Sequence, residues 1–381
     1  MSIKNLIKKE LIRQKKVINL IPSENYPSKE VLAVLGSQLT SKYAEGYPGK
    51  RYYPGNEIND QIELETQNLA RKVFGLSKIW NINVQPYSGT PANIAVYLAL
   101  LKPGETLMGM RLNEGGHLSH GHKINFSGMF YKVIQYGLNK NGFIDYKEIE
   151  KLARKYRPKI IVSGTTAYTR KIDFKKFGRI ASAWGAYHLA DISHIAGLVA
   201  AGLHQSPFPY ADVITTTTHK TLRGPRGAVI FSKDKEIASK IDRAVFPGIQ
   251  GGPHLNTIAA MGVAFEEALR SGFKNYIKQV VRNAKVLADE LKKYGFNLIS
   301  DGTDNHIILA DVTPLGFTGK EAGEKLEKKG IIVNKNMIPF DPRKPWDPSG
   351  IRLGTPAVTT QGMKEKDMAK IAKKIAEILK N

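Results

Sequence analysis

Three short runs of β-branched and apolar residues place the strongest constraint on how this chain can fold. They cover residues 160–164, 187–191 and 213–218, and each is bounded by turn-forming or helix-breaking residues. Helical patterns lie between some of them, and a further helix is predicted over residues 91–101. Strands that alternate with helices favour an α/β domain around a mostly parallel sheet.

The last third of the chain predicts a second, smaller domain of mixed helices and strands. The predicted segments are a long helical stretch at 254–294 interrupted by Gly262 and Gly272, a strand-like region at 297–312, a helix at 320–329, a strand at 331–334 and a closing helix at 363–379. A chain of 381 residues with 42% hydrophobic composition can bury more than one core. We expect an N-terminal arm (1–20), a large domain (21–267) and a small α+β C-terminal domain (268–381).

The composition excludes several kinds of site. The chain has no cysteine, so disulfides, thiolate metal sites and a cysteine nucleophile are ruled out, and a reducing cytoplasm fits best. No stretch approaches the ~18 continuous apolar residues of a membrane helix. Residues 1–16 lack the apolar centre of a secretory signal and predict an amphipathic helix with Ile3, Leu6, Ile7 and Leu11 on one face. We expect a cytoplasmic protein with no bound metal and no membrane contact.

The net charge of +23 has two explanations. A strongly basic chain can bind nucleic acid, a membrane surface or an anionic cofactor. Lys and Arg are spread over many segments, however, and no zinc finger, RNA-recognition signature or basic stripe with interleaved aromatic residues is present. A Lys-rich solvated surface explains the charge better, so we expect no nucleic-acid partner and keep a basic nucleic-acid-binding protein as an alternative function.

The segment from Val213 to Lys220 is the most informative part of the chain, with four consecutive threonines before His219 and Lys220. Threonines favour a strand, and a parallel strand ending here brings an amine to the sheet edge where such folds bind ligands. A partly desolvated lysine beside a basic residue can lose its proton and attack a carbonyl. A surface lysine at a strand end would give the same pattern.

Asp191 ends the apolar run 187–191 and is therefore predicted at the same sheet edge. A pyridoxal site needs a carboxylate there, because it keeps the ring nitrogen protonated and lets the ring accept electrons. A lone aspartate at a strand end is usually a helix cap or turn residue. The pair of Lys220 and Asp191, 29 positions apart (220 − 191), favours a pyridoxal site.

A phosphate-binding turn is predicted before the helix at 91–101. Thr90 is a good N-cap and Pro91 suits the first helical position. Free N–H groups at the positive helix end would then face a phosphate, although an ordinary capped helix looks the same. A second glycine-rich turn at 248–253 also leads into a helix. Neither turn matches the nucleotide-binding patterns GxGxxG or GxxxxGKS/T.

Ungapped sequence motifs spread along most of the chain together match the pattern of one protein family. They are IPSENY at 21–26, KYAEGYPGKRYY at 42–53, NVQP at 83–86, GGHLSHG at 115–121, NFSG at 125–128, AGLV at 196–199, TTTTHKTLRGPR at 215–226, GKEA at 319–322, NKN at 334–336 and SGIRLGTP at 349–356. Together they resemble the serine hydroxymethyltransferase family. The resemblance implies an aspartate-aminotransferase-like α/β fold (fold type I), with a mostly parallel sheet in the large domain, and a homodimer with shared active sites.

The resemblance also implies cofactor contacts. Lys220 would hold pyridoxal 5'-phosphate as an imine, Asp191 would pair with the ring nitrogen, and His117 would stack on the ring. The other expected cofactor contacts are Ser88, Gly89, Thr90, Thr166, His194 and His219, with Tyr43 and Gly252 reaching the phosphate from the neighbouring subunit. His219 joins Lys220, Asp191 and His117 in the expected catalytic set.

Substrate contacts follow in the same way. Arg352 would clamp the amino-acid carboxylate, since arginine offers two parallel donors, with Ser23, His194 and Tyr53 nearby. Glu45 would be the catalytic acid–base group at the substrate hydroxyl, in a loop where burial can raise a carboxyl pKa.

The pterin contacts implied by the resemblance are Leu112, Leu118 and Asn336, although core packing would explain either leucine. The reaction implied is the reversible transfer of the serine one-carbon unit to a tetrahydropterin, which gives glycine and the methylene-pterin. Tetrahydrofolate and tetrahydromethanopterin both remain open as the carrier. The alternative enzyme is a threonine or 3-hydroxy-amino-acid aldolase, which uses the same cofactor without a pterin.

Overall fold

The computed structural model describes residues 1–380, which form two compact units. The larger unit comprises Asn25–Thr166 and Lys171–Ile277. The smaller unit comprises Met1–Glu24, Ala167–Arg170 and Lys278–Asn381. The N-terminal segment therefore groups with the C-terminal part of the chain.

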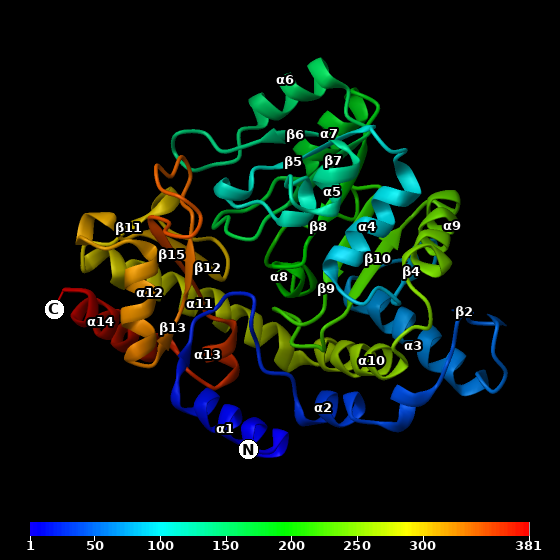
Figure 1. The fold of residues 1–381 in the computed structure, drawn as a ribbon, viewed down its shortest axis with the longest axis horizontal. Coiled ribbons are helices and arrows are strands. Elements are labelled where there is room, and N and C mark those ends of the chain that lie inside the picture. Colours follow the sequence, from blue (N-terminus) through cyan, green and yellow to red (C-terminus); the bar gives the residue numbers. More distant parts are fainter. Residues whose placement is uncertain (381) are drawn as a thin grey trace. The chain divides into compact units, whose positions relative to one another are not determined.

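A seven-stranded sheet forms the centre of the larger unit, in the order β4-β10-β9-β8-β7-β5-β6 (Figure 1). Strands β5 to β9 are parallel, whereas β10 runs antiparallel to both of its neighbours. The strands are β4 (Asn81–Asn83), β5 (Thr106–Met110), β6 (Lys132–Tyr136), β7 (Ile160–Gly164), β8 (Tyr187–Asp191), β9 (Val213–Thr217) and β10 (Ala228–Ser232). The mostly parallel sheet is confirmed, and β7 and β8 match their predicted runs residue for residue.

Helices pack on both faces of this sheet, because alternate side chains of a buried strand point to opposite sides. On one face, apolar residues of α4 and α9 pack with Ile160 and Leu189. On the other face, Phe177 of α7 stacks on His188, the neighbour of Leu189 in β8. The helices are α2 (Lys29–Leu35), α3 (Glu57–Val73), α4 (Gly89–Leu100), α5 (Phe126–Phe130), α6 (Tyr146–Tyr156), α7 (Phe174–Ala183), α8 (Ala196–Ala200), α9 (Lys235–Arg243) and α10 (Leu255–Leu269).

The smaller unit contains a four-stranded antiparallel sheet in the order β11-β12-β15-β14. A short parallel pair, β1 with β13, ties the N-terminal segment to this unit. The strands are β1 (Ile18–Asn19), β11 (Asn297–Leu298), β12 (Ile307–Asp311), β13 (Ile331–Ile332), β14 (Asn334–Asn336) and β15 (Gly350–Gly354), and the helices are α1 (Ile3–Lys16), α12 (Gly319–Lys328), α13 (Pro356–Thr360) and α14 (Glu365–Lys380). The predicted α+β organisation of this part is confirmed.

The long helical stretch predicted at 254–294 is two helices, α10 and α11 (Ser271–Lys293), divided at Arg270. The predicted interruption at Gly262 is wrong, because α10 continues through this residue. A Cβ at Gly262 would lie 2.8 Å from Oγ1 of Thr66 in α3, so the glycine permits a close approach of two helices.

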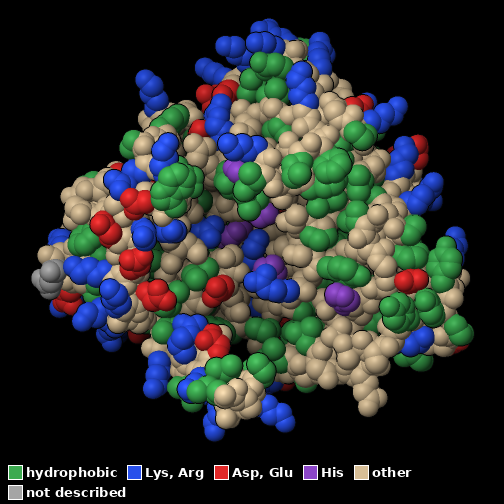
Figure 2. All heavy atoms as spheres, in the orientation of Figure 1, with side chains coloured by type: hydrophobic (Ala, Val, Ile, Leu, Met, Phe, Trp, Pro, Cys, Tyr) green, Lys and Arg blue, Asp and Glu red, His purple; other side chains and the backbone are tan. Residues whose placement is uncertain are grey.

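The basic side chains behind the net charge of +23 are spread over the visible surface. Lys and Arg side chains are scattered over the face shown in Figure 2, with acidic side chains among them, and do not gather into one basic patch on that face. Helix α1 is solvent-exposed, and its apolar stripe, Ile3, Leu6, Ile7 and Leu11, is between 47% and 71% exposed. Within residues 1–380, no helix is both long and apolar enough to cross a bilayer.

Candidate active site

Lys220 follows β9, whose parallel pairing with β8 sets Thr215 opposite Asp191. The two strands therefore end at the same edge of the sheet, as predicted. The backbone at Lys220 is fixed by the side chain of Asn25, which donates to the Lys220 carbonyl at 2.9 Å. Burial lowers the pKa of the adjacent His219 to about 3, and the charges of Lys220 and Arg226 add to the effect. His219 is therefore neutral, and its Nδ1 is buried without a hydrogen-bond partner in the described part of the chain.

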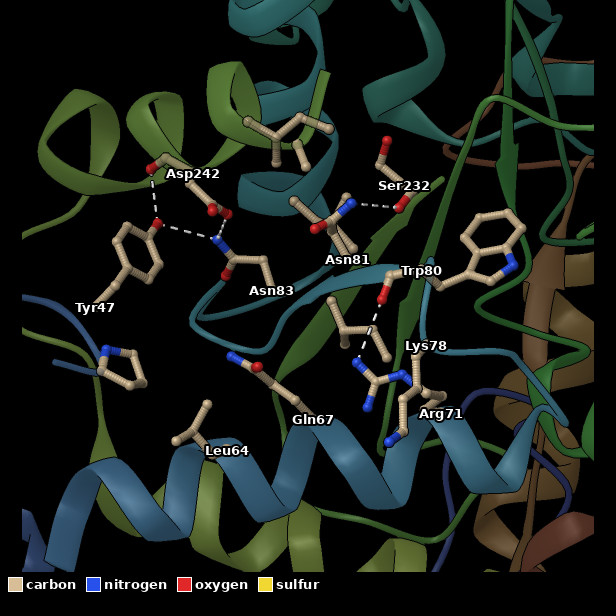
Figure 3. Close-up of a pocket in the computed structure, with 15 residues that line it drawn as sticks. Tyr47, Leu64, Gln67, Arg71, Lys78, Trp80, Asn81, Asn83, Ser232 and Asp242 are labelled. Carbon is tan, nitrogen blue, oxygen red and sulfur yellow. Dashed lines mark hydrogen bonds between the residues drawn. The ribbon is translucent and has the colours of Figure 1, made fainter. Parts of the chain in front are cut away.

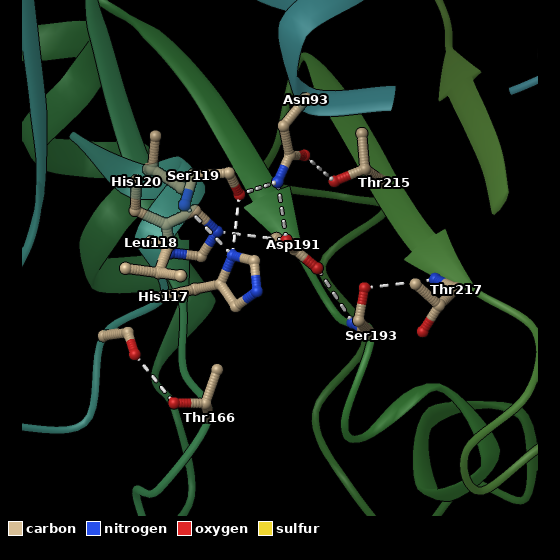
Figure 4. Close-up of polar contacts among 12 residues, drawn as sticks. Asn93, His117, Leu118, Ser119, His120, Thr166, Asp191, Ser193, Thr215 and Thr217 are labelled. Carbon is tan, nitrogen blue, oxygen red and sulfur yellow. Dashed lines mark hydrogen bonds and ion pairs between the residues drawn. The ribbon is translucent and has the colours of Figure 1, made fainter. Parts of the chain in front are cut away.

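Asp191 is the centre of a buried polar network (Figure 4). Its Oδ2 accepts from Asn93 Nδ2 at 2.9 Å and lies 3.0 Å from His120 Nε2, while Oδ1 accepts from the Ser193 amide at 3.0 Å. Burial alone raises the pKa of Asp191, but the hydrogen bonds and charge of His120, with the bonds from Asn93 and Ser193, hold it far below its usual range. These contacts favour the ionised form of Asp191 at this sheet edge.

His120 and Asn93 were not identified from the sequence. Asn93 is completely buried in α4, an otherwise apolar helix, and its Oδ1 accepts from Thr215 Oγ1 at 2.8 Å. A polar residue inside an apolar helical pattern was the signal that could have revealed it. His120 lies in the segment GGHLSHG, three residues after His117, so the same motif contains both histidines.

His117 lies beside the same network. Its Nδ1 accepts a hydrogen bond from the Ser119 amide at 3.1 Å, and its ring centroid lies 5.4 Å from that of His120. Thr166 contacts the same loop, because its hydroxyl donates to the carbonyl of Gly116 at 2.7 Å. Figure 4 shows His117, Thr166 and Asp191 around one end of the strands. The structure brings these three predicted residues together.

The predicted start of this helix was two positions too late. The N-cap is Ser88, in an extended conformation, and α4 begins at Gly89, so Thr90 and Pro91 lie inside the first turn. Proline is tolerated there because the first four N–H groups of a helix have no intrahelical partner. The amides of Gly89 and Thr90 therefore lie at the N-terminal end of α4, where an anion can bind.

This helix end lies at the same sheet edge as Asp191. A Cβ on Gly89 would be 2.8 Å from Cγ2 of Thr217 and 3.9 Å from Oγ of Ser193, so a larger residue would have to displace the Thr217 side chain. Ser193 in turn accepts from the Thr217 amide at 3.0 Å. The hydroxyl of Thr217 is buried and has no partner among residues 1–380, which is the condition of a group that awaits a ligand.

A second cluster surrounds Glu45, which precedes the hairpin β2 (Gly46–Tyr47) and β3 (Lys50–Arg51). The rings of Tyr43 and Tyr53 lie 5.1 Å apart. A Cβ on Gly252 would be 3.4 Å from the Tyr43 ring, and one on Gly251 would be 3.3 Å from Glu45 Oε1. Tyr43, Glu45, Tyr53 and Gly252 therefore form one cluster, named the Glu45 cluster.

Two further sets of predicted residues lie in the larger unit. The carbonyl of His194 accepts from Thr221 Oγ1 at 3.1 Å, so His194 lies beside the residue that follows Lys220. Leu112 and Leu118 lie in single 3₁₀ turns, and Leu118 is 41% exposed. Core packing therefore does not explain Leu118.

Arg352, Asn336 and Ser23 belong to the smaller unit. Arg352 lies in β15, where its Nη2 donates to Asn334 Oδ1 at 2.9 Å. Burial lowers the pKa of Arg352 to about 10, so its guanidinium remains charged at neutral pH. The β15 strand ends at Gly354, where a Cβ would be 2.6 Å from Pro22, the residue before Ser23. Asn336 is paired with Gly350 in the neighbouring strand.

Comparison with known proteins identifies the family. The family model described as serine hydroxymethyltransferase matches residues 1–375. A serine hydroxymethyltransferase of Desulfotalea psychrophila (strain LSv54 / DSM 12343) is 53% identical over 377 residues, which is 99% of this chain and 88% of that protein. The chain belongs to the serine hydroxymethyltransferase family.

Membership of the serine hydroxymethyltransferase family makes the chain a pyridoxal-phosphate-dependent transferase of fold type I, with a reduced pterin as co-substrate. The residues at the sheet edge fit that cofactor. The ionised Asp191 suits a ring nitrogen, the open end of α4 suits a phosphate, and the buried hydroxyl of Thr217 still needs a partner.

Proposed function

We propose that hydroxymethyl transfer in this chain depends on Lys220 as covalent anchor of pyridoxal phosphate, Asp191 as partner of its ring nitrogen and Glu45 as acid–base group. The observation that carries this proposal is the convergence of Asp191, the start of α4 and the end of β9 at one sheet edge. When bound, the cofactor supplies a protonated pyridine ring that accepts the electron pair released from the amino acid.

The residues around Asp191 bind and orient that ring. Asp191 holds the proton at the ring nitrogen, because His120, Asn93 and Ser193 keep its carboxylate charged. His117 would contact the ring and exclude water from it. The amides of Gly89 and Thr90 and the hydroxyl of Ser88 bind the phosphate, assisted by the positive end of α4. Thr166, His194 and His219 complete the cofactor contacts.

Arg352 binds the serine carboxylate through two parallel donors, with Ser23, His194 and Tyr53 as further contacts. Its buried guanidinium keeps its charge, which supports this role. Glu45 takes up the proton of the serine hydroxyl as the carbon–carbon bond breaks and the one-carbon unit leaves. The pterin that accepts this unit contacts Leu112, Leu118 and Asn336, and the exposure of Leu118 supports a ligand contact.

Two copies of the chain form the working enzyme in this proposal. Tyr43 and Gly252 reach the cofactor phosphate of the neighbouring copy. Because Glu45 and Tyr53 lie in the same cluster as Tyr43 and Gly252, they act on the neighbouring copy's substrate as well. The enzyme acts in the cytoplasm, which the lack of cysteine supports.

The test is Glu45→Gln, which keeps the side-chain shape and removes the titrating carboxylate. Transfer from serine to the pterin should fall about 10²–10⁴-fold, the usual worth of general acid–base catalysis. Cleavage of allo-threonine without pterin should persist, because it releases a stable aldehyde, and the cofactor should still bind.

The wild type is measured with tetrahydrofolate and with tetrahydromethanopterin. The carrier that supports conversion of serine to glycine is the co-substrate. Rapid cleavage of allo-threonine with no serine conversion on either carrier would identify an aldolase instead. If Glu45→Gln transfers the one-carbon unit at the wild-type rate, Glu45 is not the acid–base group.

A further inference from the structure

The backbone around Glu45 is held by hydrogen bonds to three consecutive carbonyl groups, those of residues 44, 45 and 46. The Nη1 atom of Arg51 donates to the carbonyls of Ala44 and Gly46, each at 2.8 Å. The carbonyl of Glu45 accepts from the Tyr52 amide at 3.0 Å. One guanidinium nitrogen thus binds the two carbonyls that flank Glu45, and the direction in which the Glu45 side chain leaves the backbone is fixed.

Arg51 is itself held by two carboxylates of α3. Its Nε lies 2.8 Å from Asp60 Oδ1 and its Nη2 lies 2.6 Å from Glu63 Oε2. The side chains of Arg51, Asp60 and Glu63 are only 4%, 20% and 0% exposed. Gln85 connects Glu63 to the backbone beside Glu45. Its Nε2 donates to Glu63 Oε1 at 2.9 Å and to the Gly46 carbonyl at 3.0 Å.

The arrangement is not explained by stability alone. A buried ion pair contributes little net stability, since desolvation of the charges offsets their attraction, and apolar residues of similar volume often serve as well. The planar fork of arginine is required by the geometry, because one side chain must reach two carboxylates and two carbonyls in different directions. Gly46 has a φ of +92°, and a Cβ there would lie 2.3 Å from the Lys50 carbonyl, so the turn itself is closely constrained.

We infer that Arg51 is a positioning residue for Glu45, held in place by Asp60, Glu63 and Gln85, and that it sets the acid–base carboxylate against the substrate hydroxyl. This inference rests on the proposed role of Glu45. Arg51 touches no reacting atom. It acts through the backbone on both sides of Glu45, whose carboxylate lies next to Gly251.

The test is a double-mutant cycle between Arg51→Lys and Glu45→Gln. A lysine ammonium has three donors and cannot replace the four contacts of Arg51. Arg51→Lys should lower kcat for serine-to-pterin transfer roughly 10- to 100-fold, the expected effect of a small misplacement of a catalytic group. KM for serine should stay close to that of the wild type. In the Glu45→Gln background, Arg51→Lys should cause no further loss of transfer.

A second readout uses the protein without cofactor. Amide hydrogen exchange of peptides covering residues 44–52 should be faster in Arg51→Lys, with the rest of the chain unchanged. Tyr47→Phe is the matched control, because the Tyr47 hydroxyl donates to the Asp242 carbonyl at 2.7 Å and accepts from Asn83 Nδ2 at 3.0 Å (Figure 3). Tyr47 anchors the same hairpin but does not contact the carbonyls beside Glu45, so this variant should retain transfer.

Either of two results with Arg51→Lys would overturn the inference: unchanged transfer by the folded variant, or an equal further loss of transfer when it is combined with Glu45→Gln. If Arg51→Lys does not fold, Gln85→Leu removes one donor from the Gly46 carbonyl and should show a smaller loss with the same dependence on Glu45. An additive loss from Gln85→Leu would also overturn it. If Glu45→Gln transfers the one-carbon unit at the wild-type rate, both the proposed role of Glu45 and this inference are wrong. If the wild type does not convert serine with either carrier, the proposed function itself is wrong.

Discussion

The Nε2 atom of His120 lies 3.0 Å from Oδ2 of Asp191, and both side chains are buried. The pair joins a 3₁₀ turn that follows β5 to the end of β8. A buried carboxylate without such a partner would take up a proton, because burial alone raises its pKa. His120 therefore allows Asp191 to remain charged before any cofactor binds.

Substitution of this histidine should weaken the cofactor site. His120→Phe keeps a ring of similar size and removes the donor to Asp191. Loss of a hydrogen bond to a charged group costs about 1.5–3 kcal/mol, or roughly 10- to 100-fold in affinity for pyridoxal phosphate. Absorbance titration of the cofactor-free protein measures this loss. Unchanged affinity would show that Asn93 and Ser193 suffice.

Lys220 should carry the cofactor. Borohydride should bleach the yellow colour of the purified enzyme and fix a pyridoxyl mass on the peptide that contains Lys220. Purified Lys220→Ala should lack the colour of the imine with this lysine, and borohydride should fix no pyridoxyl mass on the corresponding peptide. A label on any other lysine of the wild type would refute the assignment.

Mixing two inactive variants should restore activity if Glu45 acts across the dimer. Lys220→Ala lacks the covalent anchor, and Glu45→Gln lacks the acid–base group. A mixed dimer would hold one complete site, since a twofold interface pairs each chain's anchor with the other chain's Glu45. Random exchange should recover about a quarter of wild-type transfer. No recovery, with subunit exchange verified by mass spectrometry, would place both residues in one chain's site.

Arg352→Lys should lose one of two charge-assisted hydrogen bonds to the substrate carboxylate. The expected cost is about 1.5–3 kcal/mol, or roughly 10- to 100-fold in kcat/KM for serine. Cofactor affinity should be retained, which titration of the variant would check. Unchanged steady-state kinetics for serine would mean that the carboxylate binds elsewhere.

Acid should destabilise the cofactor-free protein through His188. Burial lowers the pKa of His188 to about 4, and its hydrogen bond with the Tyr210 carbonyl opposes the shift in part. Because the folded pKa is depressed, the unfolded chain takes up a proton first as pH falls. The stabilising contribution is complete above about pH 6.5 and is lost towards pH 4.

The free energy of unfolding should therefore fall by up to about 1.4 kcal/mol per pH unit for this residue in that range. Denaturant titrations at several pH values measure the slope. In His188→Gln, which has no titrating ring, the slope should be lower by about one proton. An unchanged slope would assign the effect to other groups, such as His219.

Much of the architecture was predictable because the signals are local. The strands β7 and β8 match their predicted runs, since buried parallel strands appear as short apolar runs bounded by turns. The start of α4 was missed by two positions, because the choice between Ser88 and Thr90 as N-cap depends on what the helix end packs against. The division of the 254–294 stretch was likewise decided by packing, which retained Gly262 inside α10.

The sequence by itself determined the fold class, the family and the chemical types available: an amine at Lys220, a carboxylate at Asp191 and a guanidinium at Arg352. Only the tertiary structure decided which groups support them. His120 and Asn93 meet Asp191 across 71 and 98 positions of the chain, and Arg51 contacts both carbonyls beside Glu45. Contacts between distant residues leave no local pattern, because they arise only when the sheet and its helices have brought those residues together.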